Sequence, residues 1–129
     1  AAAAAVGATY RIWRNEPANK NMITNRTMAD VFDQYYEELG GGHMPHIDNS
    51  GSTDMGDASH TVPSIHPWLG MNCPECQLHS KEFADKTVGE EGDQIIRRGA
   101  CALAMTATDI LTSEELLSRI KEEFKEAVK

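Results

Sequence analysis

Five histidines lie within one part of the sequence: His43, His46, His60, His66 and His79. Imidazole, carboxylate and thiolate groups bind divalent metal ions when several of them converge on one point. Loops that follow secondary-structure elements are where such groups usually meet. The stretch between the first and the last histidine is therefore where we expect a metal site or a catalytic site.

The first motif in this stretch is GSTDMGDASHTVPSIHP, which runs over residues 51–67. Its opening, Ser52, Thr53 and Asp54 followed by a Gly-Asp pair, is rich in backbone N–H groups that can bind an anion or orient a carboxylate. A surface turn closed by Asp and Ser side chains has the same composition, so both interpretations stay open.

The second motif is LHSKEFAD, residues 78–85, in which His79 lies three positions before Glu82. A single histidine on a loop is weak evidence for a ligand, because surface loops commonly carry histidine. From spacing alone, this motif is compatible with an ordinary surface residue and with a metal ligand.

Cys73 and Cys76 form a C-x-x-C pair just before the second motif. Such a pair can be a thiol–disulfide active site, which requires a helix directly after the first cysteine. It can also form a zinc knuckle with His79, for which His60 or His66 would be the fourth ligand. Two thiols without any ligand role are the third possibility.

The first half of the chain is expected to contain one strand and one helix. Residues 6–14 alternate loosely and are rich in Val, Thr, Tyr, Ile and Trp, which predicts a half-buried strand. A loop follows over residues 15–24. Asn25 is a suitable N-cap for a helix over 26–39, whose apolar residues recur every three or four positions, and the glycines 40–42 end it.

Residues 40–60 form a long polar loop, and 61–71 read as a short buried strand with prolines near its edges. A helix is expected over 90–111, where many small residues would let it approach a sheet or another helix closely. Thr112 and Glu115 form a capping box for a last helix. The apolar stripe of this last helix consists of Leu116, Leu117, Ile120, Phe124 and Val128.

The composition excludes several classes of protein. The chain has 129 residues, with 12 Lys and Arg against 20 Asp and Glu, and a net charge of −8. This excess of acid argues against nucleic acid and anionic membranes as partners. We expect no membrane span and no secretory signal, and the odd number of cysteines favours a reducing, cytoplasmic location.

In this order, the two motifs and the later helix GACALAMTATDIL resemble the C-terminal part of a family of dinuclear metal-dependent amidohydrolases and metallopeptidases. The family includes aminoacylase, carboxypeptidase G and aminobenzoyl-glutamate hydrolase. The chain looks most like the branch of aminobenzoyl-glutamate hydrolase and β-alanyl dipeptide hydrolase. The upstream sequence NKNMITNRTMADVF, residues 19–32, is also similar to that branch, and the resemblance covers residues 6–128.

The resemblance implies that His79 is the last ligand of a site for two divalent metal ions, zinc or manganese. It also implies that Ser52, Thr53 and Asp54 lie on the substrate side, with His60 near them. Two such ions about 3.5–4 Å apart share a water, lower its pKa and polarise the scissile carbonyl. The substrate would be a small molecule, either an N-acyl amino acid or a dipeptide-like amide with a free carboxylate.

The resemblance further implies an α/β fold, namely the C-terminal portion of a three-layer helix/sheet/helix catalytic domain with a mixed sheet. Residues 1–14 would be the end of a lid-domain strand, with residues 1–5 unassigned, and residues 15–129 would belong to the catalytic domain. The family's other ligands and its glutamate base have no match here. We therefore expect a fragment that is inactive without the remainder of its parent chain, and a parent enzyme that is a homodimer.

Overall fold

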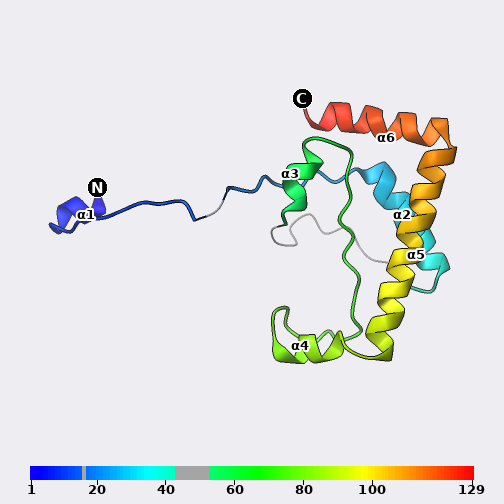
Figure 1. Ribbon diagram of the computed structural model, residues 1–129, viewed down its shortest axis with the longest axis horizontal. Helices are drawn as coiled ribbons and strands as arrows, with labels where there is room; N and C mark the ends of the chain where they lie inside the picture. The colour runs from blue at the N-terminus through cyan, green and yellow to red at the C-terminus, as the bar shows by residue number, and fades with distance from the viewer. Residues whose placement is uncertain (16, 43–52) are drawn as a thin grey trace.

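The computed structural model describes residues 1–15, 17–42 and 53–129. Three long helices make up most of the packed part: α2 (Arg26–Glu38), α5 (Glu90–Thr112) and α6 (Glu114–Ala127). They pack against one another pairwise, with α5 as the central element (Figure 1). Three short helices complete the described chain: α1 (Ala2–Ala5), α3 (Met55–Ser59) and α4 (Lys81–Lys86). No helix of the described ranges is both long and apolar enough to cross a membrane.

The core lies between α2 and α5. Phe32 and Tyr36, one turn apart on α2, are both buried, and their ring centroids lie 5.8 Å apart. Ala102 of α5 packs into the same cluster with none of its surface exposed, because a small side chain lets the two helices approach closely. The predicted close approach through small residues is confirmed at Ala102, whereas Ala100, Cys101, Ala104 and Ala107 of the same helix are exposed. Partly buried residues around the cluster are Tyr35, Leu39, Ile65 and Leu69.

The first turn of α2 is closed by side chains, including one from α6. Asn25 is the N-cap, and its side-chain oxygen accepts from the N–H of Met28 at 3.0 Å. The carboxylate of Glu123 accepts from the N–H of Arg26 at 2.5 Å and from that of Thr27 at 2.9 Å. The first three N–H groups of the helix therefore all have acceptors, and a negative charge lies at the positive end of the helix dipole.

The carboxyl group of Glu123 makes the stability of the fold depend on pH. Burial raises the pKa of this carboxyl, but the hydrogen bonds from Thr27 and Arg26 and the charge of Arg26 outweigh burial, so the pKa is lowered. A lowered pKa stabilises the folded chain above the ordinary pKa of glutamate, and this contribution is lost as the pH falls through the lowered value. We expect Glu123→Gln to be less stable than the unchanged chain at pH 7, with the difference shrinking as the pH falls. Urea unfolding of both proteins over a pH series measures this, and a pH-independent difference would contradict it.

The three long helices confirm the sequence predictions, with small differences. The helix expected over 26–39 ends one residue earlier, and the helix expected over 90–111 ends one residue later. The predicted capping box is wrong: the N-cap of α6 is Ser113, whose hydroxyl accepts from the N–H of Leu116 at 3.2 Å. Thr112 instead donates its hydroxyl to the carbonyl of Thr108 in the preceding turn.

The predicted α/β fold with a mixed sheet is wrong for the part of the chain that the structure describes. Residues 6–14 form no strand but an exposed, extended arm (Figure 1). Residues 61–71 are extended, yet their pairing is limited to one parallel bridge between Ser64 and Thr24, beside which the N–H of Asn25 donates to the Ser64 carbonyl at 2.9 Å. A strand needs a neighbour for its N–H and C=O groups, and among the described residues neither segment has one beyond this single bridge.

Candidate functional site

Helix α3 is held against the segment that leads into α2. The ring of His60 donates from Nε2 to the carbonyl of Asn21 at 3.0 Å. The hydroxyl of Ser59 is fully buried and donates to the carbonyl of Gly56 at 2.6 Å. A Cβ at Gly56 would lie 1.9 Å from the carbonyl oxygen of Lys20, so this close approach requires glycine. Among the predicted substrate-side residues, His60 is thus already engaged by the backbone of its own chain.

A polar and aromatic cluster lies beside α3. The hydroxyl of Thr53 accepts from the N–H of Met55 at 3.2 Å and lies 2.9 Å from Nδ1 of His66. The ring of His66 stacks on Trp68, with centroids 5.9 Å apart and planes inclined by 27°. Asp54 is exposed next to Thr53. The structure therefore joins Thr53 of the first motif to a histidine 13 positions later.

Trp68 was not identified as a site residue from the sequence. It is 47% exposed and covers one face of the His66 ring. The signal was present in the sequence, because residues two positions apart in an extended segment lie on the same side of it. Ser52, His43 and His46 lie outside the described residues, so the structure does not test their predicted part in the site.

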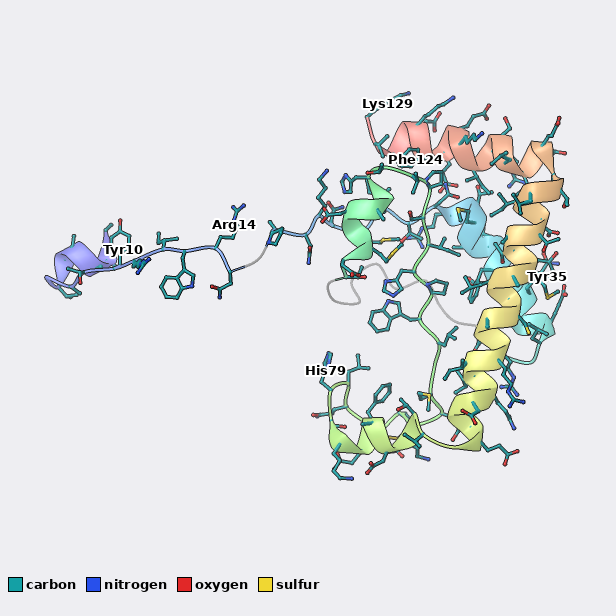
Figure 2. All side chains as sticks on the ribbon, viewed as in Figure 1. Tyr10, Arg14, Tyr35, His79, Phe124 and Lys129 are labelled. Atoms are coloured by element: carbon teal, nitrogen blue, oxygen red, sulfur yellow. A yellow bond between two sulfur atoms is a disulfide. The ribbon has the colours of Figure 1, made fainter. Side chains whose placement is uncertain are left out.

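His79 lies on the loop that leads into α4. Its backbone adopts φ 65°, the left-handed conformation, and the next residue, Ser80, caps α4 by accepting from the N–H of Phe83 at 3.1 Å. Left-handed backbone is uncommon for residues other than glycine, although histidine tolerates it better than most. Figure 2 shows the ring at the end of this loop, directed away from α5, and the side chain is exposed. Within the described residues the imidazole has no protein partner, so its nitrogens are sterically free to bind a metal ion.

The structure does not join His79 to other ligands within the part it describes. The ligand atoms that gather there in a group of three come from Cys73, Glu75 and Cys76. The zinc knuckle built from the two cysteines and His79 is therefore not formed among the described residues. Cys73 and Cys76 are instead joined by a disulfide, and Cys101 on α5 is free and exposed.

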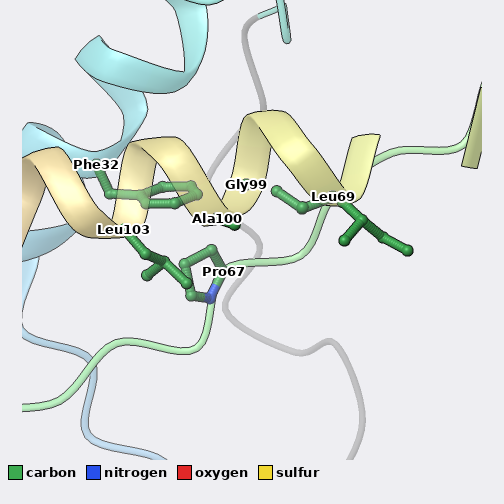
Figure 3. Close-up of a pocket in the computed structure, with 7 residues that line it drawn as sticks. Phe32, Pro67, Leu69, Gly99, Ala100 and Leu103 are labelled. Atoms are coloured by element: carbon green, nitrogen blue, oxygen red, sulfur yellow. The ribbon is translucent and has the colours of Figure 1, made fainter. Parts of the chain in front are cut away.

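An apolar groove of 320 Å³ runs between α5 and the extended segment beside it (Figure 3). Its wall contains no ionisable side chain, so it offers shape and apolar surface but no acid, base or nucleophile. The groove residues are Phe32, Pro67, Leu69, Ile96, Gly99, Ala100 and Leu103.

No protein family model matches the chain. The chain is 32% identical over 132 residues to an Xaa-Arg dipeptidase of Mus musculus, in an alignment that covers 97% of the chain and 30% of the relative. It is 33% identical over 131 residues to an Xaa-Arg dipeptidase of Homo sapiens, with 97% of the chain and 29% of the relative covered. The chain thus spans less than a third of the length of these relatives. Over nearly all of its own length, it is similar to part of two mammalian dipeptidases, which supports a relationship to peptidases.

Proposed function

We propose that this chain is part of a metal-dependent peptidase that hydrolyses the amide bond of a dipeptide or an N-acyl amino acid. The observation that carries the proposal is its similarity to two Xaa-Arg dipeptidases along 97% of its length. The names of these relatives make dipeptides with a C-terminal arginine the first substrates to test. We also propose that the catalytic unit includes polypeptide beyond these 129 residues, which agrees with the chain's coverage of less than a third of each relative.

His79 is proposed as a metal ligand of this peptidase. Its exposed imidazole has no hydrogen-bond partner among the described residues, and its backbone is in the left-handed conformation on the loop that enters α4. A neutral imidazole suits zinc or manganese, and the other ligands would come from the rest of the polypeptide. Two bound ions would supply an activated water and polarise the scissile carbonyl. We propose in addition that the complete enzyme is a cytoplasmic homodimer.

Thr53, Asp54 and His66 are proposed to lie on the substrate side. The Thr53 hydroxyl accepts from the Met55 N–H, and its single proton has two acceptors in reach, His66 Nδ1 at 2.9 Å and Asp54 Oδ1 at 3.5 Å. We propose that it is donated to His66, the nearer of the two, which makes the opposite ring nitrogen, Nε2, an N–H donor for the free carboxylate of a substrate. Trp68 fixes the ring plane by stacking on it. Ser52 and His60 remain predicted substrate-side residues. Because His60 is hydrogen-bonded to the carbonyl of Asn21, its predicted role is to position the site.

An assay of the complete polypeptide that contains this chain tests the proposed activity. With zinc or manganese supplied, we expect release of arginine from Ala-Arg, and slower or no release of the second residue from Ala-Glu. A chelator should abolish the activity, and added metal should restore it, because the ions activate the attacking water. N-acetyl amino acids extend the panel to the other predicted substrate class. A metal-loaded protein that hydrolyses neither dipeptides nor N-acyl amino acids would overturn the proposal.

A further inference from the structure

The turn from Cys73 to Cys76 contains a disulfide that has no role in the proposed peptidase reaction. Its two sulfurs are bonded, its Cα atoms are 5.4 Å apart, and the N–H of Cys76 donates to the carbonyl of Cys73 at 3.0 Å. Cys73 is only 6% exposed, Cys76 is half-buried, and Glu75 between them is exposed. The turn therefore has one shielded sulfur, one accessible sulfur and a carboxylate at the surface.

The potential ligand atoms of this turn gather at one point, although the two bonded sulfurs must separate before both can bind a metal ion. The two sulfurs and a carboxylate oxygen of Glu75 all lie within 4.8 Å of one another, and Oε1 of Glu75 is 3.2 Å from the sulfur of Cys73. Zinc binds sulfur at about 2.3 Å and carboxylate oxygen at about 2.0–2.2 Å in a tetrahedron, which places ligand atoms less than about 4 Å apart. Two cysteines separated by two residues are a common zinc-binding spacing. Breaking the sulfur–sulfur bond frees both cysteine side chains to rotate.

We propose that the Cys73–Cys76 turn is a redox-gated site for a soft divalent cation, closed by the disulfide and opened by two-electron reduction. Bonded to each other, the sulfurs cannot act as thiolates, so the oxidised turn has no soft ligands. Reduced, the turn offers two thiolates and the Glu75 carboxylate, a set with three negative charges that prefers zinc or cadmium to harder cations. The fourth position faces solvent and takes a water.

The opening reaction uses a small monothiol such as glutathione as the reductant. Its thiolate attacks the more accessible sulfur, that of Cys76, which breaks the disulfide, forms a mixed disulfide and releases the Cys73 thiolate. The thiolate of a second monothiol attacks the sulfur of the first in this mixed disulfide, which breaks the bond to Cys76, releases the Cys76 thiolate and forms the oxidised dimer of the reductant. Thiols that are protonated at that stage release their protons to solvent when the cation binds. Oxidised glutathione reverses the sequence when the cation is removed.

Thiol counting and cadmium binding on the 129-residue chain test the proposal. In the oxidised chain, maleimide labelling followed by mass measurement should find only Cys101 reactive, and in the reduced chain all three cysteines. Cadmium chloride should produce a thiolate-to-cadmium absorption band that saturates at one ion per reduced chain, and no band in the oxidised chain. Zinc should compete for the same site. Equal cadmium binding before and after reduction, or none after reduction, would overturn the proposal.

Three variants separate this site from other thiols and from the peptidase. Cys76→Ser should lose the band, whereas Cys101→Ser should bind cadmium as the unchanged chain does. Glu75→Gln should weaken cadmium binding about tenfold, which corresponds to about 1.4 kcal/mol for the lost carboxylate. Unchanged affinity in Glu75→Gln would overturn the carboxylate's part in the site. Because none of these measurements involves His79 or peptide hydrolysis, their failure would leave the proposed peptidase function standing, and the reverse also holds.

Discussion

Replacing His79 by alanine in the complete, metal-loaded polypeptide is expected to remove one bound metal ion per chain and to lower kcat/KM about 1,000-fold or more. A metal that activates water and polarises the carbonyl contributes several kcal/mol, and each 1.36 kcal/mol is about a factor of ten in rate. Metal analysis of the purified protein and steady-state hydrolysis of Ala-Arg measure the two effects. A structural defect would lower both values, so a second variant is needed to isolate the loss of the ligand.

The backbone of His79 requires a second variant. Alanine at φ 65° is strained, so His79→Ala carries a conformational cost in addition to the lost ligand. Asparagine tolerates this conformation and its amide is a poor zinc ligand, so His79→Asn should keep the fold and still lose the metal. Gln77→Ala, an exposed neighbour on the same loop, is the matched control and should leave both metal content and activity unchanged. Full activity with two bound metals in His79→Asn would show that His79 is not a ligand.

Replacing Asn25 by alanine should destabilise the chain by about 1–3 kcal/mol. The side chain, 3% exposed, accepts from the N–H of Met28 and donates from Nδ2 to the carbonyl of Ile120 at 3.0 Å. Loss of an N-cap costs about 0.5–2 kcal/mol. The Ile120 carbonyl keeps its bond within α6, so loss of the hydrogen bond from Asn25 costs about 0.5–1.5 kcal/mol. Denaturant unfolding followed by circular dichroism measures the change in the free energy of unfolding.

Aspartate at position 25 divides this effect into its two parts. Asn25→Asp keeps the acceptor for Met28 but removes the donor to Ile120, so it should lose only the second contribution. Asn15→Ala, in the exposed arm before α2, is the matched control and should change the free energy of unfolding by less than about 0.5 kcal/mol. If Asn25→Ala were as stable as Asn15→Ala, the hydrogen bond to Ile120 would not contribute to the stability of the fold.

The long helices were predictable because their signals are local. Asn25, the apolar repeat after it and the glycines that follow all lie within one stretch of sequence, and each favours the same helix. The N-cap of α6 was missed by one residue, because Thr112 and Ser113 are both suitable caps and only three-dimensional structure decides between them. Helix α4 was missed because six residues are too few for an apolar period, although Ser80 is a typical N-cap.

The strand predictions were wrong because strand propensity depends on context. Val, Ile and Trp in residues 6–14 favour a half-buried pleated surface, but here that segment has no partner strand and remains exposed. The site was only partly predictable for a similar reason. The hydrogen bond between Thr53 and His66 joins positions whose separation gives no periodic signal, and a C-x-x-C spacing fits a disulfide and a metal site equally well.

The closure of α2 by residues of α6 has a consequence for the order of events during synthesis. The bond from Asn25 to Ile120 spans 95 residues, and those from Arg26 and Thr27 to Glu123 span 97 and 96. At about 5–20 residues per second, the start of α2 leaves the ribosome roughly 5–20 s before its acceptors exist. In the first part of that interval, until α5 has been made, the nascent segment exposes Phe32 and Tyr36. A chaperone that shields apolar side chains would therefore act on this chain chiefly before α5 has been made.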